Sequence, residues 1–201
     1  MRAPILPTSH ESILEAADTV RAGGLVVFPT DTVYGLGCDP FDEAALGRLF
    51  RAKGRESKPL PVLCSSLAEA SQLVRLGVKG EKLARAHWPG GLTLVSELKA
   101  PVPRMLDQGT GTLGVRVPAL KEALELIGAC GGMLVGTSAN LSGRPSSRTA
   151  AEAQEQLGDS VDMILDGGRL GGMESTVVRV AGRGVIVLRK GMVRVKAGET
   201  K

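Results

Sequence analysis

Residues 25–37 read LVVFPTDTVYGLG, and this stretch decides the fold class. Its first four residues form a short apolar run with two valines, and Pro29 closes it, which predicts a buried strand. A polar turn with Gly35 and Gly37 follows at once. Ligands of open α/β sheets commonly bind where strands end. The stretch therefore predicts a buried strand that leads into a ligand-binding turn, although a purely structural turn explains these residues about as well.

Helical and strand patterns alternate outward from this stretch. The helix before it is predicted over residues 9–22, with Ser9 as its N-cap, and the glycines at 23 and 24 end it. Further helices are predicted over 42–53, from 66, over 80–87, over 119–128 and from 149. Further strands are predicted over 60–63, 92–98, 114–117, 133–135, 161–165, 175–180 and 185–189. This alternation predicts an α/β domain, and the hairpin-like C-terminal pair predicts a mixed sheet.

Length and composition limit the possible classes of protein. The 201 residues, 43% hydrophobic and 23% charged, predict one globular domain over residues 1–201. Apolar runs fall short of the roughly 18 residues that cross a bilayer, and the N-terminus lacks signal-peptide order, so we expect a cytoplasmic protein without membrane contact. Three cysteines and two histidines, with no C-x-x-C, predict neither disulfides nor a metal site. The net charge of +4 suits an anionic partner such as ATP or RNA.

Four further stretches combine glycines with polar or cationic residues. Residues 53–59 place three cations within six positions past a predicted helix end, and we expect an exposed loop that grips a polyphosphate. Residues 136–143 (GTSANLSG) let backbone approach a phosphate or sugar. Residues 171–177 form a glycine turn that leads into a predicted strand, and residues 188–191 place two cations at the end of a predicted strand. Taken singly, each also fits an ordinary turn or a solvated charged surface.

One glycine pattern is misleading. Residues 109–114 (GTGTLG) match G-x-G-x-x-G, but a dinucleotide site needs a strand before this motif and a helix after it. Prolines precede the motif here, and the predicted strand 114–117 follows it. We therefore predict no dinucleotide site, and the sequence has no Walker A motif.

Taken together, the motifs resemble the YrdC/TsaC-like family over nearly the whole chain. The matching segments are P-T-[DE]-T-x-Y-G-L-G at 29–37, K-x-R at 53–55, W-P-G-x-x-T at 88–93, R-V-P at 116–118, S-x-N at 138–140 and S-T-V at 175–177. Their order and spacing make the resemblance specific. It implies a YrdC-like α/β fold, a twisted mixed sheet flanked by helices.

The resemblance implies a threonylcarbamoyl-AMP synthase. Such an enzyme is a nucleotidyltransferase that forms threonylcarbamoyl-AMP and pyrophosphate from L-threonine, bicarbonate and ATP, for threonylcarbamoyladenosine in tRNA. A downstream tRNA-modification transferase complex is the implied partner, and direct RNA contact is possible. Mg²⁺ is expected with ATP, held by phosphate oxygens and water without a protein metal site.

The resemblance also implies the roles of single residues. Lys53 and Arg55 are the expected catalytic residues. The residues expected to bind threonine are Thr30, Thr32, Arg116, Gly136 and Ser175. Those expected to bind ATP are Lys53, Arg55, Lys58, Thr112, Ser138, Asn140, Ser146 and Arg189.

This chain departs from the family pattern at two places. Glu56 replaces a common proline and the loop to Pro59 is one residue shorter than in many relatives, which leaves the role of Lys58 open. Leu63 replaces a histidine that contacts threonine in some relatives. The alternative function is a double-stranded RNA-binding module of the same fold without turnover, which would read duplex shape and bind with steep salt dependence.

Overall fold

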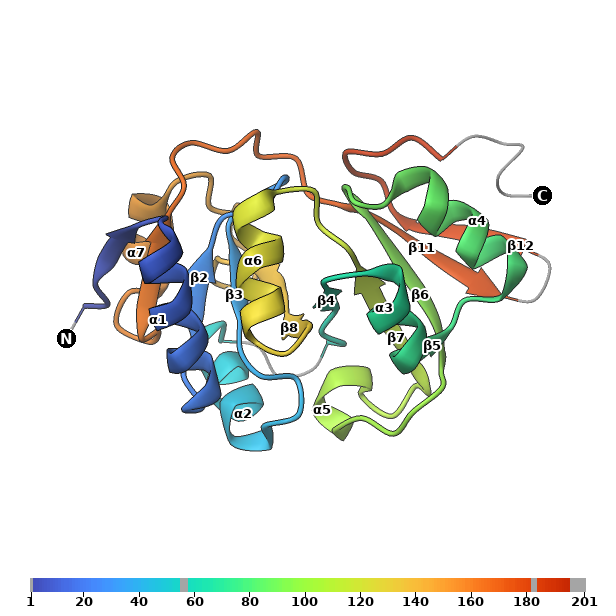
Figure 1. Ribbon diagram of the computed structural model, residues 1–201, viewed down its shortest axis with the longest axis horizontal. Coiled ribbons are helices and arrows are strands. Elements are labelled where there is room, and N and C mark those ends of the chain that lie inside the picture. Colours follow the sequence, from blue (N-terminus) through green and yellow to red (C-terminus); the bar gives the residue numbers. More distant parts are fainter. Residues whose placement is uncertain (1, 55–57, 182–183, 196–201) are drawn as a thin grey trace.

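The computed structural model describes residues 2–54, 58–181 and 184–195, and the strands of this part form two sheets (Figure 1). The smaller sheet has the order β1-β10-β2-β3-β9 and the larger β12-β11-β6-β7-β4-β8, with β5 paired to β6. The strands are β1 (Ile5–Pro7), β2 (Val26–Phe28), β3 (Gly35–Gly37), β4 (Val62–Cys64), β5 (Val74–Arg75), β6 (Leu92–Leu98), β7 (Thr112–Arg116), β8 (Met133–Val135), β9 (Thr137–Ser138), β10 (Met163–Asp166), β11 (Thr176–Ala181) and β12 (Gly184–Arg189). In both sheets a parallel pair adjoins an antiparallel one. The predicted mixed α/β fold is confirmed.

Several helices begin where a polar side chain accepts a hydrogen bond from free backbone N–H groups. The Ser9 hydroxyl accepts from the Ser12 N–H at 3.2 Å, and the Asp42 carboxylate accepts from the Ala44 and Ala45 N–H groups at 2.8 and 3.0 Å. The helices are α1 (His10–Arg21), α2 (Glu43–Ala52), α3 (Leu67–Leu73), α4 (Gly77–His87), α5 (Arg104–Asp107), α6 (Lys121–Ala129) and α7 (Ala150–Leu157). Among the residues that the structure describes, no helix has the length and apolar character needed to span a membrane.

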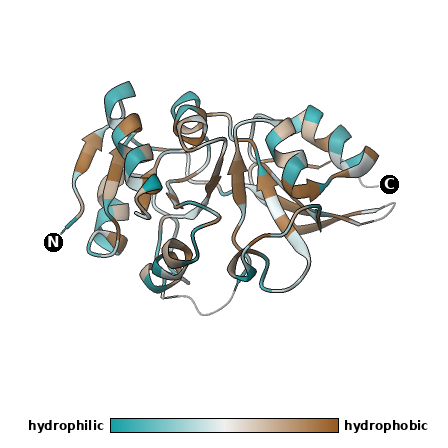
Figure 2. Ribbon diagram, turned by 60° about the horizontal axis from the view of Figure 1, so that its bottom comes forward, coloured by the Kyte–Doolittle hydropathy of each residue, from teal (hydrophilic) through white to brown (hydrophobic). Residues whose placement is uncertain are grey.

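Strand β2 is buried on both faces. Its Val26 and Phe28 pack in a cluster with α1 and α6, whereas Leu25 and Val27 belong to the larger cluster on the other face, which includes residues of α2 and α7. Figure 2 shows such apolar strands lying between helices whose hydrophilic sides face outward. Burial on both faces explains why the run at 25–28 is continuously apolar instead of alternating.

The chain passes from the larger sheet to the smaller one at Gly136, the residue between β8 and β9. Its N–H donates to the Pro61 carbonyl at 3.0 Å, and the preceding Val135 N–H donates to the Cys38 carbonyl at 3.0 Å. A Cβ atom on Gly136 would lie 2.3 Å from Leu63 Cγ. Glycine is thus required sterically where the two sheets join.

The sequence pattern missed the shortest elements. Strands β1, β3, β5 and β9 and helix α5 were not predicted, because two to four residues carry too little periodicity. Boundaries also moved: α4 begins at Gly77 instead of 80, and β7 spans Thr112–Arg116 instead of 114–117. The glycine motif at 109–114 follows α5 and runs into β7, so it lacks the preceding strand and the following helix that the dinucleotide motif requires.

Candidate functional site

A cavity of about 470 Å³ lies where the two sheets meet. Its walls come from the turn after β2, from β4, β6, β7 and β11, from the β8–β9 crossing and from the end of β12. Five cationic side chains and one carboxylate line it in the described part of the chain: Lys53, Lys58, Arg116, Arg179, Arg189 and Glu174. The size is within the usual range of ligand pockets, and the excess of cations favours an anionic ligand.

Arg116 is a buried guanidinium at the end of β7. Its Nε donates to the Gly90 carbonyl at 2.9 Å, its Nη1 to Thr32 Oγ1 at 3.1 Å and its Nη2 to Asp31 Oδ1 at 2.6 Å. Burial lowers the pKa of Arg116 below its ordinary value, the Asp31 charge raises it, and the Arg189 charge lowers it further. Three fixed bonds hold the side chain in one orientation at the cavity wall.

The turn after β2 presents two hydroxyls beside Arg116. Thr30 Oγ1 lies 2.9 Å from Thr32 Oγ1, donates to the Val33 carbonyl at 2.6 Å and accepts from the Thr32 N–H at 3.2 Å. Tyr34 lines the cavity from the same turn, and its hydroxyl donates to the Gly168 carbonyl at 2.7 Å. Burial raises the pKa of Tyr34 to about 12, so this phenol stays protonated and serves as an anchor.

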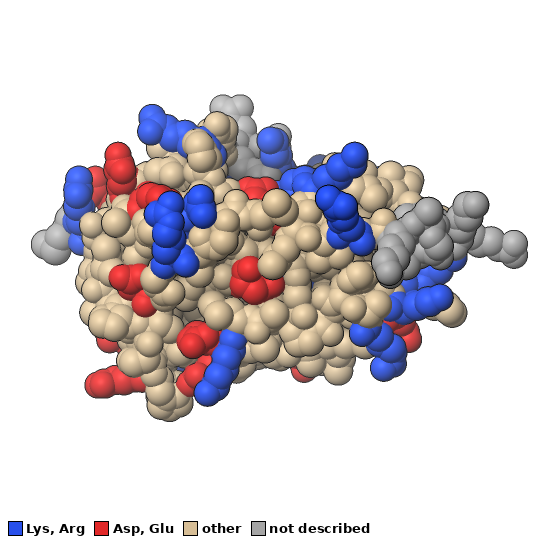
Figure 3. Space-filling view, turned by 90° about the horizontal axis from the view of Figure 1, so that it is seen from above, with Lys and Arg blue, Asp and Glu red and all other residues tan. Residues whose placement is uncertain are grey.

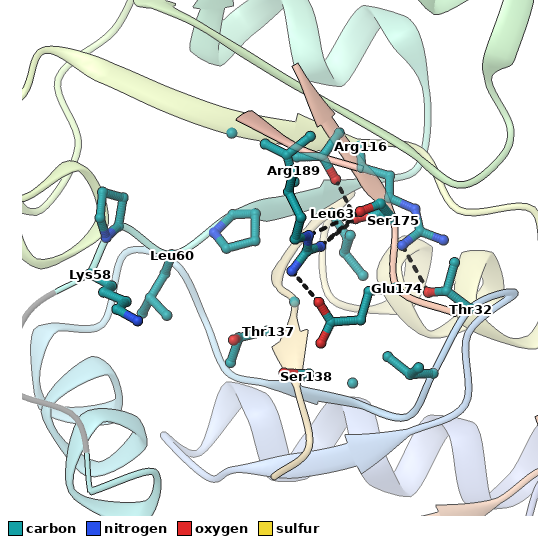
Figure 4. A pocket seen from close by; sticks show the side chains of 18 of the residues that line it. Thr32, Lys58, Leu60, Leu63, Arg116, Thr137, Ser138, Glu174, Ser175 and Arg189 are labelled. Atoms are coloured by element: carbon teal, nitrogen blue, oxygen red, sulfur yellow. Dashed lines mark hydrogen bonds and ion pairs between the residues drawn. The ribbon is translucent and has the colours of Figure 1, made fainter. Parts of the chain in front are cut away.

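Arg189 and the 174–175 backbone form the next part of the wall (Figure 4). Arg189 donates to the Ser175 carbonyl at 2.9 and 3.1 Å and to Ser175 Oγ at 3.1 Å, and it pairs with the Glu174 carboxylate. Ser175 Oγ also lies 3.0 Å from Thr93 Oγ1. Figure 4 shows Lys58 on the far side of the cavity from this group. Cations thus face the same space from two sides.

Lys53 is buried, with 3% of its surface exposed, so the predicted exposed loop position is wrong for this residue. It is the C-cap of α2, and its Nζ donates to the Ser138 carbonyl, to the Asn140 carbonyl at 2.8 Å and to Asn140 Oδ1 at 3.3 Å. Its own carbonyl accepts from the Ser142 N–H at 3.0 Å. Lys53 lines the cavity and also ties α2 to the 138–142 turn.

Comparison with known proteins agrees with this geometry. The Sua5/yciO/yrdC family model, described as "Telomere recombination", matches residues 18–191. The chain belongs to the Sua5/YciO/YrdC family. The predicted resemblance is therefore confirmed.

Two relatives of this chain are named threonylcarbamoyl-AMP synthase. A threonylcarbamoyl-AMP synthase of Halorhodospira halophila is 39% identical over 89% of this chain and 94% of its own length. One of Pyrococcus abyssi is 40% identical over 88% of this chain, but this chain spans only 53% of that protein. The crystal structure of P. abyssi Sua5 complexed with L-threonine superposes with a TM-score of 0.90 at 38% identity, covering 94% of this chain and 58% of that one.

Most of the residues that the family resemblance implied lie on this one cavity. Those on its wall are Thr30, Thr32, Lys53, Lys58, Thr112, Arg116, Gly136, Ser138, Asn140, Ser175 and Arg189. Ser146 is not among the lining residues, and its hydroxyl donates instead to the Glu174 carboxylate, which does line the cavity. Arg55 lies outside the described residues. The N–H of Gly136 is already bonded to Pro61, so it is not free for a ligand.

Sequence reasoning missed three charged residues at this family site. Glu174 and Arg179 line the cavity, and Asp31 pairs with Arg116 just behind it. Asp31 and Glu174 each stand next to a residue that was predicted to bind substrate. The position of each carboxylate beside a predicted ligand-binding residue was a signal in the sequence. The sequence did not show the cationic partners, because Arg116 lies 85 positions from Asp31 and Arg189 lies 15 positions from Glu174.

Proposed function

We propose that this chain is a threonylcarbamoyl-AMP synthase, a nucleotidyltransferase that forms threonylcarbamoyl-AMP and pyrophosphate from L-threonine, bicarbonate and ATP. The observation that carries the proposal is the convergence of Thr32, Arg116, Ser138, Ser175 and Arg189 on one cavity. These residues come from five separate stretches of the chain. The synthase names of the relatives supply the reaction.

The amino acid fits the part of the cavity around Arg116. The described residues accept three of the five N–H groups of this guanidinium, which leaves one on each terminal nitrogen. A carboxylate accepts two such groups side by side. The hydroxyls of Thr32 and Ser175 line the cavity for the rest of the substrate, and Thr30, whose hydroxyl already bonds Val33 and Thr32, holds this turn in place.

The cations farther along the wall suit the triphosphate. Arg189 and Lys58 face the cavity from two sides, and Arg179 also lines it. We infer that they offset phosphate charge, with Thr112, Ser138 and Asn140 as polar contacts to the nucleotide. The proposal also includes Arg55 and Ser146 as ATP-binding residues, and Lys53 and Arg55 as catalytic residues.

The reaction needs positioning more than a covalent intermediate. The threonine amine nitrogen bonds to the bicarbonate carbon and water leaves. A carbamate oxygen then bonds to the α-phosphorus of ATP, while the bond from that phosphorus to the pyrophosphate oxygen breaks. Holding three reactants together can contribute roughly 7–11 kcal/mol to lowering the barrier. Fixed cations stabilise charge on the phosphates without reorganising.

Mg²⁺ is expected to arrive with ATP, where it would neutralise phosphate charge. The described residues contain no group of three histidine, cysteine or carboxylate side chains that could hold a metal. Glu174, the carboxylate that lines the described cavity, is already paired with Arg189 and Ser146. These residues fit an ion that is held by phosphate oxygens and water.

Shape recognition of duplex RNA explains this site less well. On the face seen from above, Lys and Arg side chains are scattered among Asp, Glu and uncharged residues (Figure 3). A surface that follows the RNA backbone needs no cavity lined by Arg116 and by paired hydroxyls. We infer a cytoplasmic synthase whose product passes to a tRNA-modification transferase complex.

Pyrophosphate release from ATP, measured with and without threonine and bicarbonate, tests the proposed function. Release should require both co-substrates. Arg116→Met should abolish most of it, whereas Arg48→Met serves as the matched control, because Arg48 pairs with Asp162 and does not line the cavity. Release that ignores threonine would refute the proposal, and salt-dependent RNA binding without any release would favour the RNA-binding module.

A further inference from the structure

Asp31 stands behind the cavity wall, between two residues that line it. Thr30 and Thr32 face the cavity, but Asp31 does not, and its side chain is only 13% exposed. Its Oδ1 accepts from Arg116 Nη2 at 2.6 Å and from the Ala119 N–H at 3.0 Å. One carboxylate oxygen thus bonds both to the end of β7 and to the segment that follows it.

The turn around Asp31 is itself held in place. Thr30 Oγ1 accepts from the Thr32 N–H and donates to the Val33 carbonyl, so the backbone on both sides of Asp31 is tied. Arg116 is restrained in the same way by the Gly90 carbonyl and Thr32 Oγ1. The pair therefore joins two structures that already have one geometry, which lowers the entropic cost of forming it.

Asp31 also supplies the charge that this guanidinium needs. The Arg116 side chain is only 6% exposed, and the nearby Arg189 charge is unfavourable to it. Removing one partner of a buried ion pair leaves the other charge unpaired. Without the Asp31 charge, we expect the Arg116 guanidinium to reorient toward water or toward another acceptor.

We propose that Asp31 is a positioning residue that acts through Arg116: it aims the two remaining N–H groups of the guanidinium at the carboxylate of the amino-acid substrate. This inference rests on the proposed function. In this proposal Asp31 contacts neither the amino acid nor ATP, yet it affects the binding of the amino acid alone. Losing Asp31 should therefore weaken the use of the amino acid and leave the use of ATP almost unchanged.

The test compares Asp31→Asn with the wild-type protein. We expect the KM for threonine to rise roughly ten- to a hundredfold, the usual effect of one charge-assisted hydrogen bond. The KM for ATP should change less than about twofold. Asp31→Glu keeps the charge on a longer side chain and should show a smaller rise. Asp162→Asn, which removes the carboxylate of the half-exposed Arg48 pair, should alter neither KM.

A double-mutant cycle with Arg116→Met separates positioning from a general structural effect. In the Arg116→Met background, Asp31→Asn should add almost nothing to the threonine KM, because the two residues act as one unit. Equal rises in both KM values, no rise, or an undiminished effect in that background would overturn the inference. If Asp31→Asn fails to fold, Asp31→Glu decides by the same split between threonine and ATP.

Failure of the proposed function can be told apart from failure of this inference. If the wild-type protein released no pyrophosphate, the synthase proposal would fall. Threonine binding measured by calorimetry would still show whether Asp31→Asn weakens recognition of the amino acid. Binding that is unchanged by the substitution would overturn the role of Asp31.

Discussion

Replacing the buried Lys53 by methionine tests the most surprising feature of the cavity. Methionine keeps an unbranched apolar stem and removes the ammonium. The Asn140 carbonyl, which accepts from Nζ at 2.8 Å, then loses this donor, whereas the Ser138 carbonyl still accepts from the Asn140 N–H at 3.0 Å. A hydrogen bond to a charged group contributes about 1.5–3 kcal/mol, and a buried acceptor without a donor costs about 1–3 kcal/mol.

Because these terms overlap, we expect Lys53→Met to lower the free energy of unfolding by about 3 kcal/mol. For a chain of this length that corresponds to a fall in Tm of roughly 6–12 °C. Urea unfolding followed by circular dichroism measures the free energy, and a thermal scan measures Tm. Lys58→Met is the matched control, since Lys58 lines the same cavity but is exposed, and it should cost less than about 0.5 kcal/mol.

Equal stability of Lys53→Met and the wild-type protein would refute this reasoning. The ammonium would then contribute nothing net to the fold, and its position would be explained by a bound phosphate alone. A large loss of stability would mean instead that low activity in any Lys53 variant must be separated from damage to the 138–142 turn before the residue is called catalytic.

Two further predictions concern the join between the sheets and the buried thiols. Gly136→Ala should destabilise the fold by about 1–3 kcal/mol, because the added Cβ would lie 2.3 Å from Leu63 Cγ. Gly171→Ala is the control, since a Cβ there would have no atom within 4 Å. Equal unfolding midpoints of the two variants would contradict the steric argument. Burial raises the pKa of the Cys38 and Cys64 thiols from 9.0 to about 12. Above about pH 9 the unfolded chain therefore releases thiol protons that the folded chain retains. The free energy of unfolding should fall as the pH rises from 9 toward 12. Between pH 9 and 10 the loss should be about 1 kcal/mol per thiol, measured as the difference in unfolding free energy between the wild-type protein and a Cys38→Ala/Cys64→Ala variant, and parallel pH profiles of the two proteins would rule it out.

Local signals in the sequence were sufficient for much of the fold. Ser9 and Asp42 begin helices because their side chains satisfy backbone N–H groups a few residues away. The run at 25–28 forms a strand that is buried on both faces, as continuous apolarity predicts. Both signals lie within a few residues of the element that they specify, so the chain alone carries them.

The candidate site could be predicted only as a set of motifs. The sequence indicated Thr30, Arg116 and Ser175, and all three lie on the cavity. It did not indicate that Asp31 pairs with Arg116, 85 positions away. Nor did it indicate that Glu174 pairs with Arg189, because that contact depends on the register of β11 against β12, which shifts between Val177 and Val178.

The sequence by itself determined the longer helices and strands, several helix caps and the polar residues at strand ends, since each of these depends on neighbours along the chain. Only the tertiary structure decided that Lys53 is buried, that the strands form two sheets with a crossing at Gly136, and which carboxylate faces which guanidinium. Burial and ion pairing depend on distances between remote segments. Those distances exist only after the sheets have packed together.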